Sequence, residues 1–416
     1  MTTSRQNTAE ELPLPVWELV ALFVAMTALV ALAIDMMLPA LDDIARDLDV
    51  SRANDQQYVI TTYLAGFSMA QIAYGPLADR FGRKSVMLGA IGLFLLVTII
   101  CAMTPSFGLL LAARFLQGCA AAASRVITVA IARDLTSGRR MAEIMSMVMT
   151  AFMAVPVLAP SLGQAVMAIA GDWRWIFGFL IVFGIALAAW IQMRLPETLH
   201  PEYRTPLSVR AVSSAFAEAM TNRIMLGYTL AGIAFFGGLY AFLGSSQQIF
   251  VEHFSLTDNQ FPIAFAAIAT GMGFTSYINS RLVNRLGQRR LAHGALIGFS
   301  GVSAIHALVL YSGVDNLYLF VGLLALAMAL LGLIAANFSS IAMEPMGHIA
   351  GTASAAYGFV SGIGATLIGA LVGQLYNGTA VPLVTGQALL GTLSLVCVFI
   401  TERGQLFGIG EDHEAG

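Results

Sequence analysis

Long apolar runs constrain the fold of this chain more than any other feature. Each is ~20 residues or longer, enough for a helix to cross the ~30 Å hydrocarbon core of a bilayer. The 416 residues are 58% hydrophobic and 11% charged, whereas a soluble domain has about a quarter charged residues. A bilayer offers no water to backbone groups, so spanning segments form helices or closed barrels, and runs this long exclude a barrel. The sequence therefore predicts an all-α membrane protein with twelve transmembrane helices, near 16–40, 56–77, 85–104, 107–132, 142–169, 173–194, 223–250, 260–282, 291–312, 317–341, 353–377 and 380–400.

The longest interruption of the apolar pattern, residues 195–222, falls midway along the chain. It separates a predicted N-terminal six-helix bundle at 1–194 from a C-terminal six-helix bundle and cytoplasmic tail at 223–416. Within this linker, four apolar residues recur at helical spacing, which predicts a helix lying on the membrane surface. They are Val209, Val212, Phe216 and Met220.

The placement of lysine and arginine predicts the orientation in the membrane. If both termini are cytoplasmic, the inner side holds 16 of the 21 lysines and arginines, and the outer side holds Arg46, Arg52 and Arg174. The first run, from about Trp17 to Pro39, is too long for a cleaved signal peptide, so we expect none. We therefore expect a multi-pass protein with both termini in the cytoplasm.

A weak internal repeat relates the two halves. The segment Gly75–Lys84 follows the second span, and Ser280–Arg289 follows the eighth. Parallel repeats of six spans are typical of one large architecture, with its substrate site between the halves near mid-membrane. The sequence thus predicts two pseudo-symmetric bundles. The matching residues are Leu77, Arg80 and Gly82 in the first half and Leu282, Arg285 and Gly287 in the second, 205 residues apart.

Three charged residues lie well inside apolar runs: Asp35, Arg114 and Arg125. An ionisable group at membrane depth costs about 2.5–3.5 kcal/mol on insertion scales and marks a pathway or a proton relay. Burial favours the neutral form of a carboxyl group, while a nearby arginine favours the charged form, so a pocket that alternates between these settings loads and releases a proton. One acid and two arginines therefore indicate a proton-linked core, with Asp35 and Arg114 as the coupling pair.

The sequence leaves the partners of the two arginines open. A permanently charged guanidinium at this depth needs partners, and for Arg114 these are Asp35, Gln117 or backbone carbonyls. For Arg114 the alternative is a structural arginine that ties helices together. For Asp35 the alternative is a carboxylate locked in a permanent ion pair with Arg114. Arg125 follows 11 residues later on almost the same helix face. It either lines the inner cavity or extends to the lipid headgroups.

Local motifs resemble those of a known family. The segment Gly75–Lys84, with the pattern Gly-x-Leu-Ala-Asp-Arg-x-Gly-Arg-Lys, resembles the signature of the major facilitator superfamily. Arg114–Gly118 is similar to a signature of its proton-coupled members, and Ala159–Gly163 to that of its antiporters, although the usual flanking glycines are here Ala159 and Gln164. The resemblance covers the whole chain from the first to the twelfth span and implies the major facilitator fold.

Two further segments resemble one branch of that family. Ala33–Leu41, around Asp35, and Ala350–Gly358, entering span 11, are similar to the bicyclomycin and chloramphenicol resistance branch of drug:proton antiporters. The resemblance implies a proton-coupled multidrug exporter of the bacterial inner membrane that works by alternating access. Its expected partners are a drug-like small molecule, protons and the lipid bilayer, with no nucleic acid and no cofactor. We expect a monomer.

The loop signature has a gating interpretation. The resemblance implies that Asp79 contacts the N-terminus of span 11, where the helix dipole favours a carboxylate by about 0.3–1 kcal/mol. Arg133, at the inner end of span 4, is its expected ion-pair partner. Such a cluster would hold one conformation and release in the other; the alternative is that the basic residues only anchor the inner side. The gating candidates are Gly75, Asp79, Arg80, Gly82, Arg83, Lys84 and Arg133.

Pro156, Pro160 and Gly163 predict a bent or loosened fifth span that allows close approach of another helix. In the antiporter interpretation this span seals against its counterpart and prevents proton leak. The alternative is that proline and glycine are simply frequent in membrane helices.

The candidate lining of the central pocket combines aromatic, apolar and amide side chains, which suit an amphipathic ligand. The alternative for each is packing or lipid contact. His306, in the ninth span, is either a protonatable site or a hydrogen-bonded structural histidine. The pocket candidates are Ile34, Leu38, Tyr63, Gln117, Met153, Phe235, Phe236, Tyr240, Gln247, Asn337 and Tyr357.

Charge in the pocket constrains the substrate. With Asp35 offset by Arg114, a dication finds no second carboxylate to replace its hydration. We therefore expect a preference for neutral or zwitterionic amphipathic compounds such as phenicol antibiotics. The alternative is a proton-linked carrier of a natural metabolite, such as a sugar, nucleoside or siderophore.

The sequence lacks the motifs of two other classes of membrane protein, intramembrane enzymes and ATP-driven pumps. An intramembrane enzyme would need a His-Glu-x-x-His metal site or paired aspartates, and an ATP-driven pump would need a Gly-x-x-x-x-Gly-Lys-Ser/Thr loop; the sequence contains none of these. The three cysteines, Cys101, Cys119 and Cys397, lie inside apolar runs, so we expect packing residues and no metal site.

Overall fold

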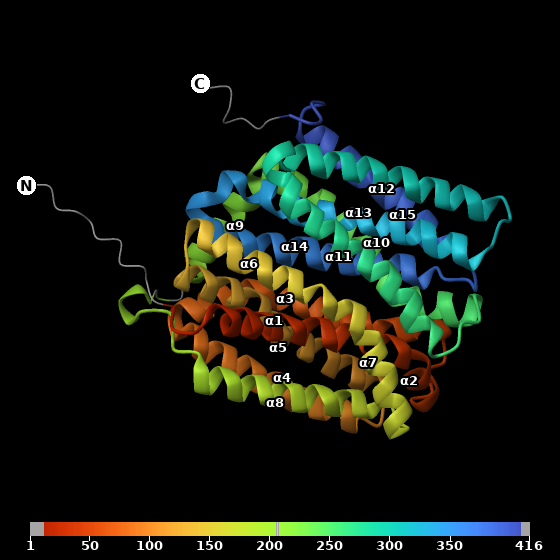
Figure 1. The fold of residues 1–416 in the computed structure, drawn as a ribbon, viewed down its shortest axis with the longest axis horizontal. Coiled ribbons are helices and arrows are strands. Elements are labelled where there is room, and N and C mark those ends of the chain that lie inside the picture. Colours follow the sequence, from red (N-terminus) through yellow and green to blue (C-terminus); the bar gives the residue numbers. More distant parts are fainter. Residues whose placement is uncertain (1–11, 205, 207, 409–416) are drawn as a thin grey trace, which may run out of the picture.

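Long helices lie side by side in two groups, one from each half of the chain (Figure 1). The computed structural model describes residues 12–204, 206 and 208–408. The ends of the two predicted bundles, 1–11 and 409–416, lie outside the described residues. In the described part the chain is helical, with no strand.

The N-terminal half contains six spans, of which the first and fifth are each built from two or more helical pieces. Its elements are α1 (Val16–Asp35), η1 (Leu38–Ala40), α2 (Leu41–Asp47), η2 (Ala53–Gln57), α3 (Tyr58–Phe81), α4 (Arg83–Met103), α5 (Phe107–Leu135), α6 (Gly138–Phe152), α7 (Ala154–Ala170) and α8 (Arg174–Arg194).

The C-terminal half contains the other six spans, after a linker that carries η3 (Pro201–Tyr203) and α9 (Val209–Thr221). Its elements are α10 (Arg223–Gln247), η4 (Gln248–His253), α11 (Gln260–Leu286), α12 (Gln288–Tyr311), α13 (Leu317–Met343), η5 (Glu344–Ile349), α14 (Ala350–Gln374) and α15 (Val381–Thr401).

The spans agree with the twelve expected from the apolar runs. Ten segments of the described chain are long and apolar enough to cross a membrane, and one of them, Leu317–Gln374, contains both α13 and α14. The remaining span, which is the second along the chain, is α3; its inner half carries Gln71, Asp79 and Arg80. These polar residues lower its hydropathy although it lies in the bundle with the others.

Two spans are broken, and for the fifth the sequence predicted a bend. The first stops at Asp35 and continues through η1, because Pro39 has no N–H to donate to the carbonyl four residues earlier. The fifth breaks between Phe152 and Ala154, where Pro156 likewise removes the bond to the carbonyl of Phe152. In both cases a proline, Pro39 or Pro156, explains the break.

We call the end of the bundle that holds Arg46, Arg52 and Arg174 the outer end, after the predicted orientation, and the opposite end the inner end. In Figure 1 the inner end is on the left, where α9 lies, and α2 marks the outer end on the right. The linker helix α9 packs on α14 and α10, with the rings of Phe216 and Phe359 6.2 Å apart. Its place on the membrane surface stays a prediction.

Candidate functional site

Asp35 is the last residue of α1, at the break that precedes Pro39. Its side chain is buried, with 6% of the residue exposed. Within the described part of the chain it has no hydrogen bond and no ion pair. A buried carboxyl group without a cationic partner can exchange a proton without first breaking a salt bridge.

Arg114 is completely buried in α5, and each of its nitrogens donates a hydrogen bond. Nε donates to the carbonyl of Val59 at 3.1 Å, Nη2 to the carbonyl of Ala33 at 2.9 Å, and Nη1 to Oε1 of Gln117 at 2.6 Å. The guanidinium also lies over the ring of Tyr63, 4.5 Å from its centroid. These contacts tie α5 to α1 and α3.

The expected ion pair between Arg114 and Asp35 is absent. Arg114 instead uses Gln117 and backbone carbonyls, which the sequence had left open as alternatives. One of these carbonyls, that of Ala33, lies two residues before Asp35. Gln117 donates in turn to Oγ1 of Thr98 at 2.8 Å, which adds α4 to the network. In this conformation Arg114 therefore fixes the end of α1 that carries Asp35, without pairing with its carboxyl group.

Three other candidates of the N-terminal half lie near breaks in helices. Ile34 and Leu38 are buried on either side of the break in α1. Met153, at the junction of α6 and α7, faces α11, where a Cβ built on Gly273 would lie 3.3 Å from the Met153 Cβ. The broken segments of the N-terminal half thus lie close to the candidate residues.

Phe235, by contrast, belongs to the core of the C-terminal bundle. It is completely buried, and its ring centroid lies 5.3, 5.7 and 6.0 Å from those of Phe236, Phe299 and Phe338. The expectation that Phe235 lines the pocket is therefore wrong. Its neighbour Phe236 is half-buried beside this cluster.

Two amide candidates have different surroundings. Asn337 of α13 donates to Oδ1 of Asn279 at 2.7 Å and so ties α13 to α11, which is a structural contact. Gln247, at the end of α10, is 2% exposed, and its Oε1 has no partner in the described chain. It lines a small cavity at the outer end together with Pro39 and Phe261.

Arg125 is an exposed residue of α5 and has no hydrogen bond or ion pair within the described chain. Lining of the inner cavity and extension to the lipid headgroups, the two alternatives that the sequence left for Arg125, both stay predictions.

Direct hydrogen bonds join the two halves at the outer end. Gln57 of η2 donates to Oε1 of Gln248 at 2.6 Å and to the carbonyl of Gly373 at 3.0 Å. Asn54 donates to the carbonyl of Tyr376 at 2.8 Å, and its Oδ1 accepts from Gln248 at 3.1 Å. We call these side chains, with Gln374, whose Nε2 donates to the Asn54 carbonyl, the outer amide cluster. No motif in the sequence points to them.

The seam between α3 and α14 continues this closure inward. A Cβ built on Gly362 would lie 2.3 Å from Oγ of Ser68, and one built on Gly358 would lie 2.3 Å from Oε1 of Gln71, so only glycine allows these helices to approach. Further along α3, a Cβ on Gly75 would meet nothing within 4 Å. Among the described residues, the hydrogen bonds between the two halves thus lie at the outer end.

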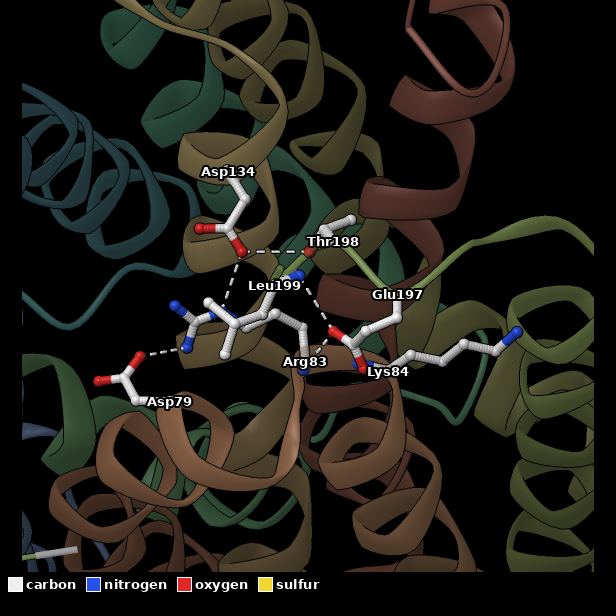
Figure 2. Close-up of polar contacts among 7 residues, drawn as sticks. All are labelled: Asp79, Arg83, Lys84, Asp134, Glu197, Thr198 and Leu199. Carbon is white, nitrogen blue, oxygen red and sulfur yellow. Dashed lines mark hydrogen bonds and ion pairs between the residues drawn. The ribbon is translucent and has the colours of Figure 1, made fainter. Parts of the chain in front are cut away.

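Asp79 lies in a charged cluster within the N-terminal half (Figure 2). Arg83 pairs with two carboxylates: its Nη1 lies 2.5 Å from Oδ1 of Asp79, and the Arg83 Nε lies 3.0 Å from Oδ2 of Asp134. The expected partner Arg133 is exposed beside this cluster, so its assignment as the partner of Asp79 is wrong. In this structure Asp79 therefore pairs within its own bundle rather than with the start of α14, as the resemblance implied.

Glu197, from the start of the linker, completes the cluster. Its carboxylate accepts from the backbone N–H groups of Arg83 at 2.7 Å and Lys84 at 3.2 Å (Figure 2). These are orphan donors of the first turn of α4, where the helix dipole also favours a negative charge. Gly82 allows this contact, since it has φ +97° and its Cβ would lie 2.3 Å from Oε2 of Glu197.

The remaining gating candidates lie at the rim of this cluster. Lys84 donates from Nζ to the carbonyl of Gln192 at 2.9 Å, which ties the loop to α8. Arg80 is exposed, with its guanidinium 5.5 Å from the centroid of the Phe81 ring. Neither side chain crosses to the other half.

The C-terminal half also has a glycine with positive φ before its third span and an acidic residue at its end, but the acidic residue has different partners. Gly287 has φ +83° and ψ 154°, close to the φ +97° and ψ 150° of Gly82. Glu402 follows Glu197 by the same 205 residues that separate these glycines. It accepts from Nε of Arg289 at 2.9 Å rather than from helix backbone. The internal repeat therefore extends to an acidic residue at the end of each half.

The fifth span packs closely through Gly163. A Cβ on this residue would lie 2.2 Å from the carbonyl oxygen of Met36, so α7 lies directly against the break in α1. Pro160 is buried in the same helix, and Pro156 follows the break at its start. On its other side α7 packs on α11, the eighth span.

His306 is buried, and neither ring nitrogen has a hydrogen-bond partner in the described chain. Its ring centroid lies 4.9 Å from that of Phe320. The alternative of a hydrogen-bonded structural histidine is therefore wrong here, and nothing places His306 near Asp35.

Comparison with known proteins decides the family. The profile described as Major Facilitator Superfamily matches residues 23–369. The chain belongs to this superfamily. It is 31% identical over 354 residues to an uncharacterized MFS-type transporter, YdgK, of Bacillus subtilis, covering 85% of this chain and 87% of the relative.

Two further relatives have names that mention resistance. The chain is 30% identical over 373 residues to the bicyclomycin resistance protein homolog of Haemophilus influenzae, covering 89% and 92% of the two chains. It is 30% identical over 380 residues to the chloramphenicol resistance protein of Pseudomonas aeruginosa, covering 89% and 88%.

Solved structures share the fold. The human organic anion transporter MFSD10 superposes with a TM-score of 0.68 at 18% identity, covering 93% of this chain and all of the other. The Escherichia coli xylose transporter XylE superposes at 0.71 and 12%, covering 93% and 99%. The expected architecture of two six-helix bundles is thereby confirmed, and this superfamily member is a multi-pass membrane transporter rather than an enzyme.

Proposed function

We propose that this transporter is a proton-coupled drug exporter of the bacterial inner membrane, with Asp35 as the proton carrier. The observation that carries the proposal is the buried, unpaired carboxyl group of Asp35 at the break in α1. The names of the relatives support drug efflux. Arg114 acts as a positioning residue, because its bond to the carbonyl of Ala33 holds the end of α1.

The closed outer end supports alternating access. Here the outer amide cluster joins the halves, and we infer that the central space opens at the inner end, so that a drug enters from the cytoplasm. In the opposite state the outer cluster separates, the drug leaves, and Asp35 takes a proton from outside. The cluster of Asp79, Arg83 and Asp134 then meets the start of α14. One proton enters for each compound exported.

The experiment replaces Asp35 by Asn, which keeps its size but cannot titrate. Drug uptake into inverted vesicles is measured under an imposed pH gradient for the wild type, Asp35→Asn and the matched control Asp49→Asn, an exposed outer residue. Asp35→Asn should abolish gradient-driven uptake, and the control should retain it. Uptake by Asp35→Asn at the wild-type rate would remove Asp35 from the mechanism.

For the substrate we propose neutral or zwitterionic amphipathic compounds, with phenicols as the test case. The spans hold one unpaired acid for a cation to use, which disfavours dications. Export of a neutral compound against one entering proton moves net charge, so phenicol efflux should respond to membrane potential. Strong export of a dicationic dye, or phenicol export insensitive to voltage, would overturn this preference.

A proton-linked carrier of a natural metabolite is the alternative. A resistance and uptake screen in an efflux-deficient strain separates the two, because an exporter lowers drug accumulation while a metabolite carrier leaves it unchanged. Cytoplasmic termini belong to the proposal as well, on the basis of the lysine and arginine distribution, and so does a monomeric state.

A further inference from the structure

A charged cavity at the outer end of the N-terminal half has no part in the proposed transport cycle. It lies between α2 and the turn from α7 to α8, where these helices meet at the right of Figure 1. Its volume is about 460 Å³, which is too large for a lone ion and falls within the range of small-molecule sites, about 300–1,000 Å³. The charged residues that line it are Asp43, Arg46, Asp47, Asp172 and Arg174.

Both arginines of this cavity are paired but keep unused donors. Arg174 donates from Nη1 to Oδ2 of Asp47 at 2.6 Å, and Arg46 donates from Nε to Asp42 and from Nη2 to Asp43. Within the described chain, Nε and Nη2 of Arg174 and Nη1 of Arg46 make no hydrogen bond. A guanidinium has five N–H donors, so each arginine can still bind an anionic group from outside the protein.

The cavity also has unused acceptor oxygens. Oδ1 of Asp47 and Oδ2 of Asp43 accept no hydrogen bond in the described chain, and Asp172 brings a third carboxylate to the same cavity. Three carboxylates against two guanidiniums leave an excess of one negative charge. This excess disfavours a purely anionic ligand and favours one that also carries a positive charge.

By the predicted spans, the cavity lies at the outer surface of the membrane. Met167 lines it from the last turn of α7, and Trp173 lines it just before α8 begins. Two apolar side chains next to these are exposed, Ile169 by 88% and Trp175 by 59%. Tryptophans are enriched where hydrocarbon meets the headgroups, so a ligand of this cavity can keep its apolar part in the bilayer.

We propose that this cavity binds the headgroup of an outer-leaflet phospholipid that carries a primary ammonium, that is, an ethanolamine phospholipid. The phosphate bonds to the free nitrogens of Arg46 and Arg174, since guanidinium and phosphate form strong charge-assisted bonds. The ammonium donates to the free oxygens of Asp43 and Asp47. A choline headgroup has no N–H to donate, and a glycerol headgroup brings only the negative charge, so both bind more weakly. The site depends on neither the transported compound nor proton coupling.

The test titrates the whole, delipidated protein in detergent with phosphatidylethanolamine, phosphatidylcholine and phosphatidylglycerol of identical acyl chains. Native mass spectrometry gives the dissociation constant of the first lipid bound. The wild type should bind phosphatidylethanolamine at least about tenfold more tightly than the other two, as expected for charge-assisted bonds. Arg174→Gln should weaken this binding by a similar factor, and Arg174→Lys by less. Asp47→Asn should remove the preference over phosphatidylcholine, because it removes an acceptor of the ammonium.

The matched control is Arg52→Gln, an exposed arginine of the outer end that does not line the cavity. It should bind the three lipids as the wild type does. The comparison of headgroups on the wild type needs no variant, so it tests the proposal even if a variant folds poorly. Equal binding of the three lipids, an unchanged affinity in both Arg174→Gln and Asp47→Asn, or displacement of the bound lipid by a phenicol would each overturn the assignment. The export function is judged separately, by Asp35→Asn.

Discussion

Removing the side-chain amide of Gln57 should open the outer end. Gln57 donates two hydrogen bonds across the halves, to Oε1 of Gln248 and to the carbonyl of Gly373. Each is worth about 0.5–1.5 kcal/mol net, and both acceptors become hydrated when the halves separate. Gln57→Ala should therefore destabilise the outer-closed state by about 1–3 kcal/mol, which shifts the ratio of closed to open molecules by roughly 5- to 150-fold.

The assay measures the distance between spin labels on the two halves at the outer end. Labels at Arg52 and Val314, both exposed, are introduced as cysteines after replacement of Cys101, Cys119 and Cys397. Double electron–electron resonance on the purified protein should show a longer-distance population that grows in Gln57→Ala.

The control for this measurement is Gln192→Ala, an exposed glutamine on α8. Its distance distribution should match that of the wild type. An unchanged distribution in Gln57→Ala would refute the reasoning, because the outer amide cluster would then contribute nothing to closure.

Two further predictions concern stability. Arg114→Lys should lower the free energy of unfolding by about 2–3 kcal/mol, because an ammonium cannot replace three divergent donors and the stack on Tyr63; a thermal midpoint equal to the wild type in detergent would contradict this. Gly82→Ala should lower it by about 1–2 kcal/mol, because its Cβ would meet Glu197 at a φ of +97°. Gly89→Ala, whose Cβ meets nothing within 4 Å, is its control and should not lose stability, so equal midpoints for the two alanine variants would rule out the steric argument.

The fold could be predicted from the sequence because the features that determine it lie within short stretches of the chain. Apolar runs of span length, the linker at 195–222 and the repeat around Gly82 and Gly287 each act within a short stretch of chain. The breaks at Asp35 and Met153 were also recoverable, since Pro39 and Pro156 lie where a helical hydrogen bond would otherwise form.

The partners within the site were harder to predict, because they depend on which helices face each other. An arginine in a span needs acceptors, but carbonyls satisfy it as well as carboxylates, and Arg114 uses them. Phe235 has the composition expected of a pocket residue and lies instead in a core of other phenylalanines. The outer amide cluster and Glu197 carry no motif, since their contacts join segments up to 322 residues apart.

The 205-residue spacing has a meaning for the history of the chain. Gly82 and Glu197 recur at this spacing as Gly287 and Glu402, as expected if a six-span gene was duplicated and fused. At the same spacing Asp35 corresponds to Tyr240, and Arg114 and Arg125 correspond to the leucines Leu319 and Leu330. The charges at membrane depth therefore lie in the first copy, and the corresponding positions of the second copy hold an uncharged tyrosine and two leucines.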